Sequence, residues 1–127
     1  MEMNSMEIRT LKIGKRNWQL VNESWSTSRA WGHKTNILKN GVEYVEHKCR
    51  YYNRTWESYT YQNCMFGAIR TLREQEENRF IENYKYNNNI DRFKKGQKDL
   101  VIAEFNKTEI AKDLDKLYKA VELREFN

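Results

Sequence analysis

Apolar and polar residues alternate over short stretches in the first part of the chain, as they do in strands with one buried face. Such stretches cover residues 6–13 and 17–23, and Trp18 and Leu20 are the clearest apolar positions of the second stretch. The segment Gly14-Lys15-Arg16-Asn17 between them reads as a turn. This pattern predicts an antiparallel hairpin at the start of the chain.

The dipeptide Asn40-Gly41 is the strongest local signal for a second hairpin. Asn-Gly readily takes the positive φ values of a type I′ turn, whose twist suits a two-residue connection. The predicted arms are residues 35–39 and 42–46. Residues 24–29 are rich in small polar side chains and predict a loop, so we expect the strand before the turn to open at Trp31.

The Asn40-Gly41 turn also predicts which residues of this hairpin face each other. With the turn at the centre, the numbers of facing residues sum to about 81, which places His33 opposite Lys48 and His47 opposite Lys34. Along the second arm, even-numbered and odd-numbered residues fall on opposite faces. Neither face is purely apolar, so we expect one face of the sheet to be solvated.

From position 58 the apolar spacing changes to that of a helix. The apolar positions recur at intervals of four and three, and they are Tyr61, Met65, Ala68, Ile69 and Leu72. An amphipathic stripe of this kind predicts a long helix over residues 58–86. Thr55 or Ser58 is the expected N-cap.

A second apolar stripe predicts the last helix, over residues 108–124. Its members are Ile110, Leu114, Leu117, Tyr118 and Val121. Asn106, followed three residues later by Glu109, predicts a capping box at its start. Before it, we expect a short helix or turn on each side of Gly96.

Strands therefore come first and helices after, which is the order of an α+β fold rather than of a doubly wound nucleotide-binding fold. We predict a single domain over residues 1–127, with a three- to four-stranded antiparallel sheet from residues 6–56 and C-terminal helices packed on one face. Only 39% of the residues are hydrophobic, so aromatic side chains must fill much of the core. Trp18, Tyr44 and Trp56 are expected there.

The charge of the chain is positive and uneven. The formal net charge is +5. Residues 1–60 hold ten Lys or Arg and six Glu, a balance of +4, whereas residues 61–127 hold thirteen against twelve, a balance of +1. A basic strand-rich half favours polyanions or an acidic protein surface as partners, although many small soluble proteins are as basic without such a partner.

The cysteines and the apolar runs bear on the compartment. Cys49 and Cys64 lie beside apolar or aromatic neighbours and are too few for a disulfide framework, so we predict free buried thiols. The first fifteen residues lack the apolar core of a secretory signal, and no apolar run reaches the length of a membrane span. We therefore expect a cytoplasmic protein.

The densest candidate chemistry lies in residues 50–62, which hold five aromatic residues and two arginines. Rings and guanidinium groups can stack on bases and pair with phosphates or carboxylates, although the same residues can form a cross-strand ladder. The candidate partner-binding residues are Arg29, Trp31, Lys34, Lys48, Arg50, Tyr52 and Arg54. We expect Arg50 and Arg54 to contact phosphate or acidic groups, with Trp31 and Tyr52 as apolar anchors.

The common catalytic signatures are missing from the sequence, which has no Gly-rich phosphate loop, HExxH or GxSxG. His33, His47 and Glu57 leave a small metal-independent ribonuclease as an alternative. A zinc site built from the two histidines and Cys49 has no evident fourth ligand. We therefore expect a binding protein without enzymatic activity, cofactor or bound metal.

The segment Tyr-Asn-Arg-Thr-Trp-Glu-Ser-Tyr-Thr-Tyr-Gln at residues 52–62, with Ser24-Trp25-Ser26 and Trp31-Gly32-His33-Lys34, resembles small accessory proteins of phages and mobile elements of AT-rich Gram-positive bacteria. The resemblance covers residues 6–75. Such accessory proteins often inhibit host defence, anti-CRISPR proteins among them. The resemblance implies a small inhibitor of a host protein–nucleic-acid machine, above all a CRISPR effector nuclease, acting in the bacterial host cell.

Two further alternatives stay open. A protein that binds RNA or single-stranded nucleic acid directly would use the same residues as an inhibitor of an effector nuclease. A homodimer that buries the same aromatic residues would explain the composition equally well.

Overall fold

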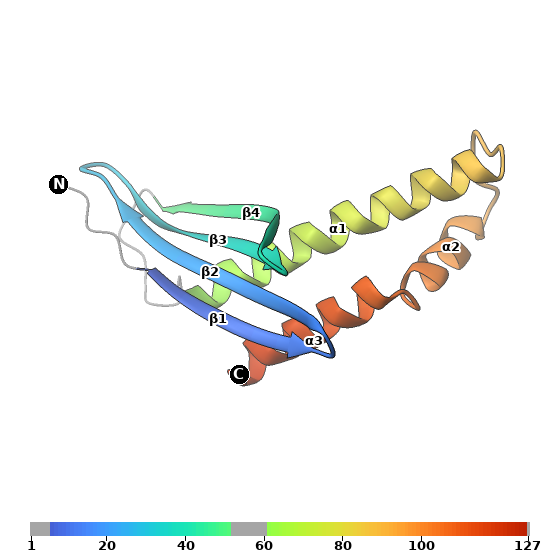
Figure 1. The fold of residues 1–127 in the computed structure, drawn as a ribbon. Helices are drawn as coiled ribbons and strands as arrows, with labels where there is room; N and C mark the ends of the chain where they lie inside the picture. Colours follow the sequence, from blue (N-terminus) through green and yellow to red (C-terminus); the bar gives the residue numbers. More distant parts are fainter. Residues whose placement is uncertain (1–5, 52–60, 127) are drawn as a thin grey trace.

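The computed structural model describes residues 6–51 and 61–126. Four strands come first and three helices follow, so the chain has the predicted α+β fold (Figure 1). The elements are β1 (Met6–Ile13), β2 (Arg16–Ser26), β3 (Trp31–Lys39), β4 (Val42–Tyr51), α1 (Tyr61–Asn87), α2 (Gln97–Phe105) and α3 (Glu109–Leu123).

The sheet is an antiparallel meander in the order β1-β2-β3-β4, and its first hairpin is confirmed. The predicted loop over residues 24–29 is only partly correct, because β2 continues to Ser26, which faces Trp31 of β3. The connection is therefore shorter than expected. Its ends are held by the backbone N–H of Thr27, which donates to the carbonyl of Ala30 at 2.7 Å.

The Asn40-Gly41 turn is also confirmed. Asn40 has a φ of 52° and Gly41 a φ of 82°, the pair of positive values that a type I′ turn requires. Next to the turn, Leu38 faces Glu43, and these numbers sum to 81 as predicted.

Beyond the turn the predicted register is wrong by one residue. A bulge at Ile37 and Leu38 shifts the pairing, so that Ile37 faces Val45. His33 then faces Cys49 instead of Lys48, and His47 faces Thr35 instead of Lys34. The extra residue on β4 changes the pairing of everything after it, and a turn signal at positions 40 and 41 carries no information about such an insertion.

The helices begin and end close to the predicted positions. Residues 52–60, with the proposed caps Thr55 and Ser58 and the core candidate Trp56, lie outside the described residues. The cap of α3 is Thr108 and not Asn106: Thr108 is extended and its hydroxyl accepts from the backbone N–H of Ala111 at 3.4 Å. Asn106 instead has helical φ and ψ angles and ends α2.

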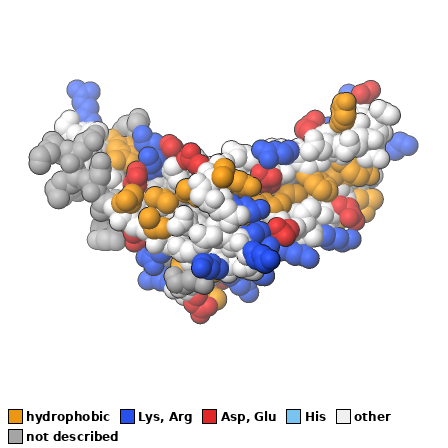
Figure 2. Space-filling view, viewed as in Figure 1, with side chains coloured by type: hydrophobic (Ala, Val, Ile, Leu, Met, Phe, Trp, Pro, Cys, Tyr) orange, Lys and Arg blue, Asp and Glu red, His pale blue; other side chains and the backbone are white. Residues whose placement is uncertain are grey.

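The region around Gly96 agrees with the expected short helix or turn on each side: turns precede it and one helix follows it. Gly96 has a φ of 80° and directly precedes α2, whereas residues 88–96 form turns and bends. α2 then folds back along the outer half of α1, which continues well beyond the sheet (Figure 1). Phe80 and Phe105 meet there with ring centroids 5.8 Å apart, and hydrophobic side chains follow the same arm in Figure 2. No described helix is long and apolar enough to cross a membrane.

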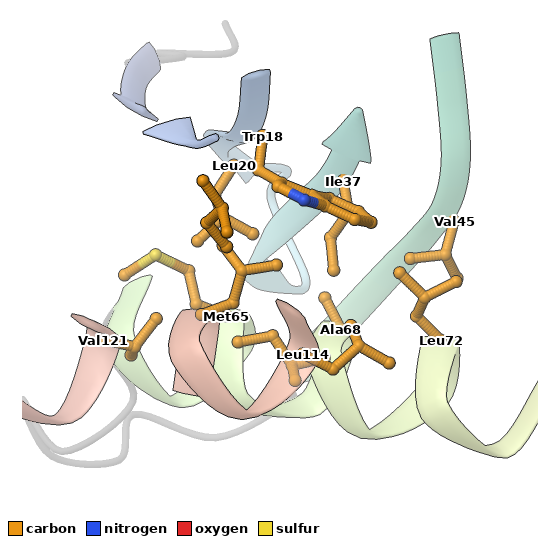
Figure 3. Packing of buried hydrophobic residues seen from close by; sticks show 12 residues of the cluster. Trp18, Leu20, Ile37, Val45, Met65, Ala68, Leu72, Leu114 and Val121 are labelled. Atoms are coloured by element: carbon orange, nitrogen blue, oxygen red, sulfur yellow. The ribbon is translucent and has the colours of Figure 1, made fainter. Parts of the chain in front are cut away.

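The main core lies between the sheet and the first half of α1, with α3 closing it from the side of β1 (Figure 3). The sheet contributes Trp18, Leu20, Ile37 and Val45; α1 contributes Met65, Ala68, Ile69 and Leu72; α3 contributes Leu114, Leu117 and Val121. Trp18 is fully buried, as predicted. Tyr44, also expected in the core, is 38% exposed and packs edge-on against Trp18 with centroids 5.9 Å apart.

A buried polar contact joins α3 to the first hairpin. The carboxylate of Asp113 accepts hydrogen bonds from Nε and Nη2 of Arg16 at 2.6 and 2.9 Å, and from the indole N–H of Trp18 at 2.9 Å. Asp113 itself is 1% exposed. Both carboxylate oxygens therefore have charged or polar donors, which a carboxylate needs in order to stay ionised in a core.

Candidate partner-binding surface

The helices pack on one face of the sheet and leave the other face uncovered by any described element, as Figure 1 shows. We call this second surface the open face. Its side chains are half-buried or exposed, and they include Ile8, Val21, Glu23, Trp25, Lys34, Asn36, Leu38, Glu43, Glu46 and Lys48. A solvated face of this kind is what the alternating pattern predicted.

Trp25 and Gly32 shape one end of the open face. The two residues face each other across β2 and β3, and the indole lies over the glycine backbone. A Cβ atom at Gly32 would come within 2.6 Å of the indole ring, so only glycine leaves room for it. On the neighbouring strand, the Nζ atom of Lys48 lies 4.9 Å from the centre of the Trp25 ring, within the range of a cation–π interaction.

Lys34 and Lys48 face each other directly on β3 and β4, a pairing of like charges that is unfavourable by itself. The strands compensate for it. Nζ of Lys34 forms an ion pair with Glu23 at 3.1 Å, and this contact raises the pKa of Lys34 despite the opposing effect of burial. The ammonium group of Lys48 makes its cation–π contact with the ring of Trp25.

The open face is not a positive patch. The described part of this face carries the carboxylates of Glu23, Glu43 and Glu46 beside the ammonium groups of Lys34 and Lys48. The bulge contributes to this balance, because it shifts the pairing beyond Glu43 and so places Glu46, opposite Asn36, on the same face as Glu43. The amide of Asn36 donates a hydrogen bond to Glu43. The basic charge predicted for the strand-rich half is therefore largely balanced on the open face.

The predicted partner-binding residues do not form one surface: some lie on the open face, one in a turn and one on the covered face. Lys34 and Lys48 lie together on the open face, and Arg29 is exposed in the turn that follows Trp25 at the same end of the sheet. Trp31 lies on the opposite, helix-covered face, where its ring is 5.7 Å from that of His33.

Three of the predicted residues are not located in full. The backbone of Arg50 pairs with Gly32 at the Trp25 end, but its side chain is outside the described part. Tyr52 and Arg54 lie outside the described residues. Trp25 was not among the predicted residues, because residues 24–29 were predicted to form a loop, and its pairing with Gly32 appears only in the folded sheet.

Both histidines pack on the helix-covered face. The ring of His47 lies against Gly67 of α1, with its Nδ1 atom 3.4 Å from the hydroxyl of Thr71. Burial lowers the pKa of His47, and the positive charge of Arg70 lowers it further. His33 lies 4.9 Å from the ring of Tyr61.

The two thiols are free. Cys64 is fully buried, and its Sγ atom donates to the carbonyl of His47 at 3.6 Å. Burial raises the pKa of Cys64 to about 12, so the reactive thiolate form is suppressed. Cys49 is half-buried opposite His33. Among the described residues, no three His, Cys, Asp or Glu side chains are grouped so that they could hold a metal ion.

Comparisons with protein-family models, with curated proteins and with solved structures give no match to the chain.

Proposed function

We propose that the protein is a non-enzymatic binding protein that inhibits a host protein–nucleic-acid machine, with a CRISPR effector nuclease as the leading target in the cytoplasm of a bacterial host. The observation that carries this proposal is the pair of Trp25 and Lys48 on the open face of the sheet. The sequence resemblance to phage accessory proteins supplies the class of target.

The Trp25 end is suited to binding because it offers a large ring and a cation that are already held in place. The indole is held by the close approach of Gly32, and the ammonium of Lys48 is held by the ring. Groups that are ordered before binding lose little conformational entropy when a partner arrives. Tryptophan is also the residue most enriched among the dominant contacts of protein interfaces.

The mixed character of the open face favours a protein as the contacting partner. Ile8, Val21 and Leu38 lie between carboxylates and ammonium groups on this face. Alternating apolar, acidic and basic groups match a protein surface better than a uniformly negative phosphate backbone. Arg29, exposed in the turn after Trp25, adds a cation at the same end of the sheet, where an acidic or phosphate group of the target would lie.

Direct binding of RNA or single-stranded DNA is the second candidate function. The indole of Trp25 beside a lysine is an arrangement on which a base can stack while a phosphate is neutralised. The ribonuclease alternative has less support, because His33 and His47 pack against rings and helix backbone on the covered face.

The test is a pull-down of the tagged protein from a host lysate, with and without nuclease treatment, using the variant K48E and a matched control. The control is K85E, because Nζ of Lys85 lies 4.9 Å over the ring of Phe93 on the helical arm, the same geometry away from the sheet. We expect K48E to lose at least about tenfold in partner capture. We expect K85E to retain its partner.

Nuclease treatment and salt then separate the two candidate functions. A partner protein that survives nuclease treatment supports the inhibitor. Binding that disappears with nuclease, and that weakens by orders of magnitude between low and physiological salt, supports direct nucleic-acid binding. Full retention of the partner by both K48E and W25A would show that the open face is not the interface. Nuclease turnover that is lost in H47A would favour the ribonuclease.

A further inference from the structure

A basic groove runs between the free edge of β1 and α3, and nothing in the proposed function depends on it. Its volume is about 790 Å³. β1 is an edge strand that pairs only with β2 within the described chain. α3 lies beside this edge, as Figure 1 shows.

The groove exposes the edge of β1 rather than one of its faces. Three consecutive strand residues, Leu11 to Ile13, line it, together with Gly14 of the following turn. Successive side chains of a strand point to opposite faces, so three strand residues in a row can line one groove only where the strand edge itself borders it. The backbone N–H and C=O groups on an unpaired edge are available to an added strand.

The charge of the groove is strongly positive. Lys12 lies on the β1 side, and Lys112, Lys116 and Lys119 lie on α3. All four are exposed and form no ion pair within the described part of the chain.

Two carboxylates also line the groove, and only one of them opposes the lysines. Asp115 is paired with Arg73 of α1, so its charge is already balanced. Glu125 is the remaining carboxylate among the described lining residues. The four lysines therefore set the sign of the groove.

Aliphatic side chains form the rest of the lining. Leu11 and Ile13 come from β1, and Ala120 and Leu123 come from α3; Leu123 is 56% exposed. The described lining contains no aromatic ring. A single-stranded nucleic acid would find phosphate partners here but no platform on which to stack its bases.

We propose that this groove binds an extended acidic segment of a partner protein, which adds to β1 as a fifth strand. The backbone of the segment would pair with residues 11–13, and its carboxylates would lie against the lysines of α3. Strand addition to a free edge is an established mode of peptide recognition, in which the backbone supplies affinity and alternate side chains supply specificity.

The test measures fluorescence anisotropy of a labelled peptide of about ten residues in which glutamate alternates with valine. The protein variant is K12E/K116E, which reverses one charge on each wall of the groove. The control is K98E, at an exposed lysine of α2 outside the groove. We expect the double variant to weaken binding at least about tenfold and K98E to leave it within about twofold.

Two further probes separate strand addition from charge attraction. A peptide of the same sequence with alternate backbone nitrogens methylated keeps its charge but cannot pair as a strand, so we expect its binding to be lost. A single-stranded oligonucleotide of the same charge tests whether the groove binds any polyanion. NMR amide shifts on titration should centre on Leu11 to Gly14. If K12E/K116E does not fold, the neutralising variant K12Q/K116Q and the amide shifts give the answer.

The proposal is overturned by any of three results. The acidic peptide binds K12E/K116E as well as the unmodified protein, or the methylated peptide binds undiminished, or the oligonucleotide binds more tightly than the peptide and with the same dependence on the lysines.

Discussion

At the scale of single residues, Asp113 decides how α3 is held against the sheet. Burial alone would raise the pKa of this carboxyl group. The hydrogen bonds from Arg16 and Trp18, with the positive charges of Arg16 and Lys39, outweigh burial and lower the pKa below its ordinary value. Asp113 is therefore ionised in the folded protein at neutral pH, and three donors depend on its charge.

We expect D113A to destabilise the protein by about 3 kcal/mol, because it leaves the indole N–H of Trp18 and the Nε and Nη2 atoms of Arg16 without their acceptor. Chemical denaturation would measure the change in free energy of unfolding. D115A is the control, two residues away on the same helix, and its exposed ion pair with Arg73 should cost less than about 1 kcal/mol. Equal losses in the two variants would contradict this role of Asp113.

The lowered pKa of His47 predicts that the protein becomes less stable at mildly acidic pH. Its pKa in the folded protein is lowered from 6.5 by burial and by Arg70, so the unfolded chain binds the proton more readily. The full stability is therefore present above about pH 6.5, and it falls as the pH is lowered from there toward the folded-state pKa. Asp113 follows at lower pH, since its stabilisation is lost as its carboxylate is protonated.

Thermal unfolding between pH 8 and pH 5 would measure the contribution of His47. We expect the melting temperature to fall through this range in the unmodified protein and to fall less in H47Q, which cannot take up the proton. In R70Q the melting temperature should fall by a smaller amount over the same pH range, because this variant removes one of the two causes of the lowered pKa. A profile that is the same in all three proteins would contradict the prediction.

At the scale of elements, the contact of α1 with β4 depends on the absence of a side chain at Gly67. A Cβ atom there would lie 2.4 Å from Nε2 of His47, closer than atoms can approach. Glycine inside a helix costs about 1 kcal/mol relative to alanine, so propensity by itself would favour replacing it. The glycine is therefore explained by the packing of two elements rather than by the helix.

We expect G67A to destabilise the protein by about 1–2 kcal/mol, because the clash with His47 outweighs the gain in helix propensity. Urea denaturation would measure it. In the background of H47A the same substitution should be neutral or stabilising, since no ring remains to be displaced. N78A, at an exposed position of the same helix, should gain a few tenths of a kcal/mol. A gain from G67A alone would contradict the packing argument.

At the scale of the whole molecule, the protein has two packed regions of unequal size. The sheet, the first half of α1 and α3 share the main core. The outer half of α1 and α2 form an arm, joined through contacts such as that of Phe80 with Phe105. α2 packs mainly on α1 and belongs to no part of the main core, so less apolar surface holds it in place.

We therefore expect amide hydrogen exchange to be faster in the arm than in the main core. Amides of α2 should exchange through local opening with protection at least about tenfold lower than that of residues 64–72, which exchange only on global unfolding. F105A should lower the protection of α2 further and leave the sheet unchanged. Uniform protection over α1, α2 and the sheet would show that the arm and the main core unfold together.

Much of the fold follows from short-range pattern. The helical stripes, the alternation of the strands and the Asn40-Gly41 turn each depend on residues a few positions apart, and these elements were predicted close to their observed bounds. The order of strands before helices then gives the α+β class. Lys34 and Lys48 lie on strands, as the local alternation predicted, and Arg29 lies in the turn between β2 and β3.

What the sequence could not determine depends on contacts between distant segments. The bulge that shifts His33 from Lys48 to Cys49 places Tyr44 against Trp18, a neighbour on another strand. The packing of the helices on one face of the sheet puts Trp31 on the covered face and Trp25 on the open face.

The same reason applies to α3. Its sequence shows an amphipathic helix, but only its position beside β1 turns three of its lysines into the wall of a groove and Asp113 into a buried ion pair. Periodicity determines which elements form, because it acts within one element. Register, burial of polar groups and the sites between elements are decided by tertiary packing, because they arise only when separate elements meet.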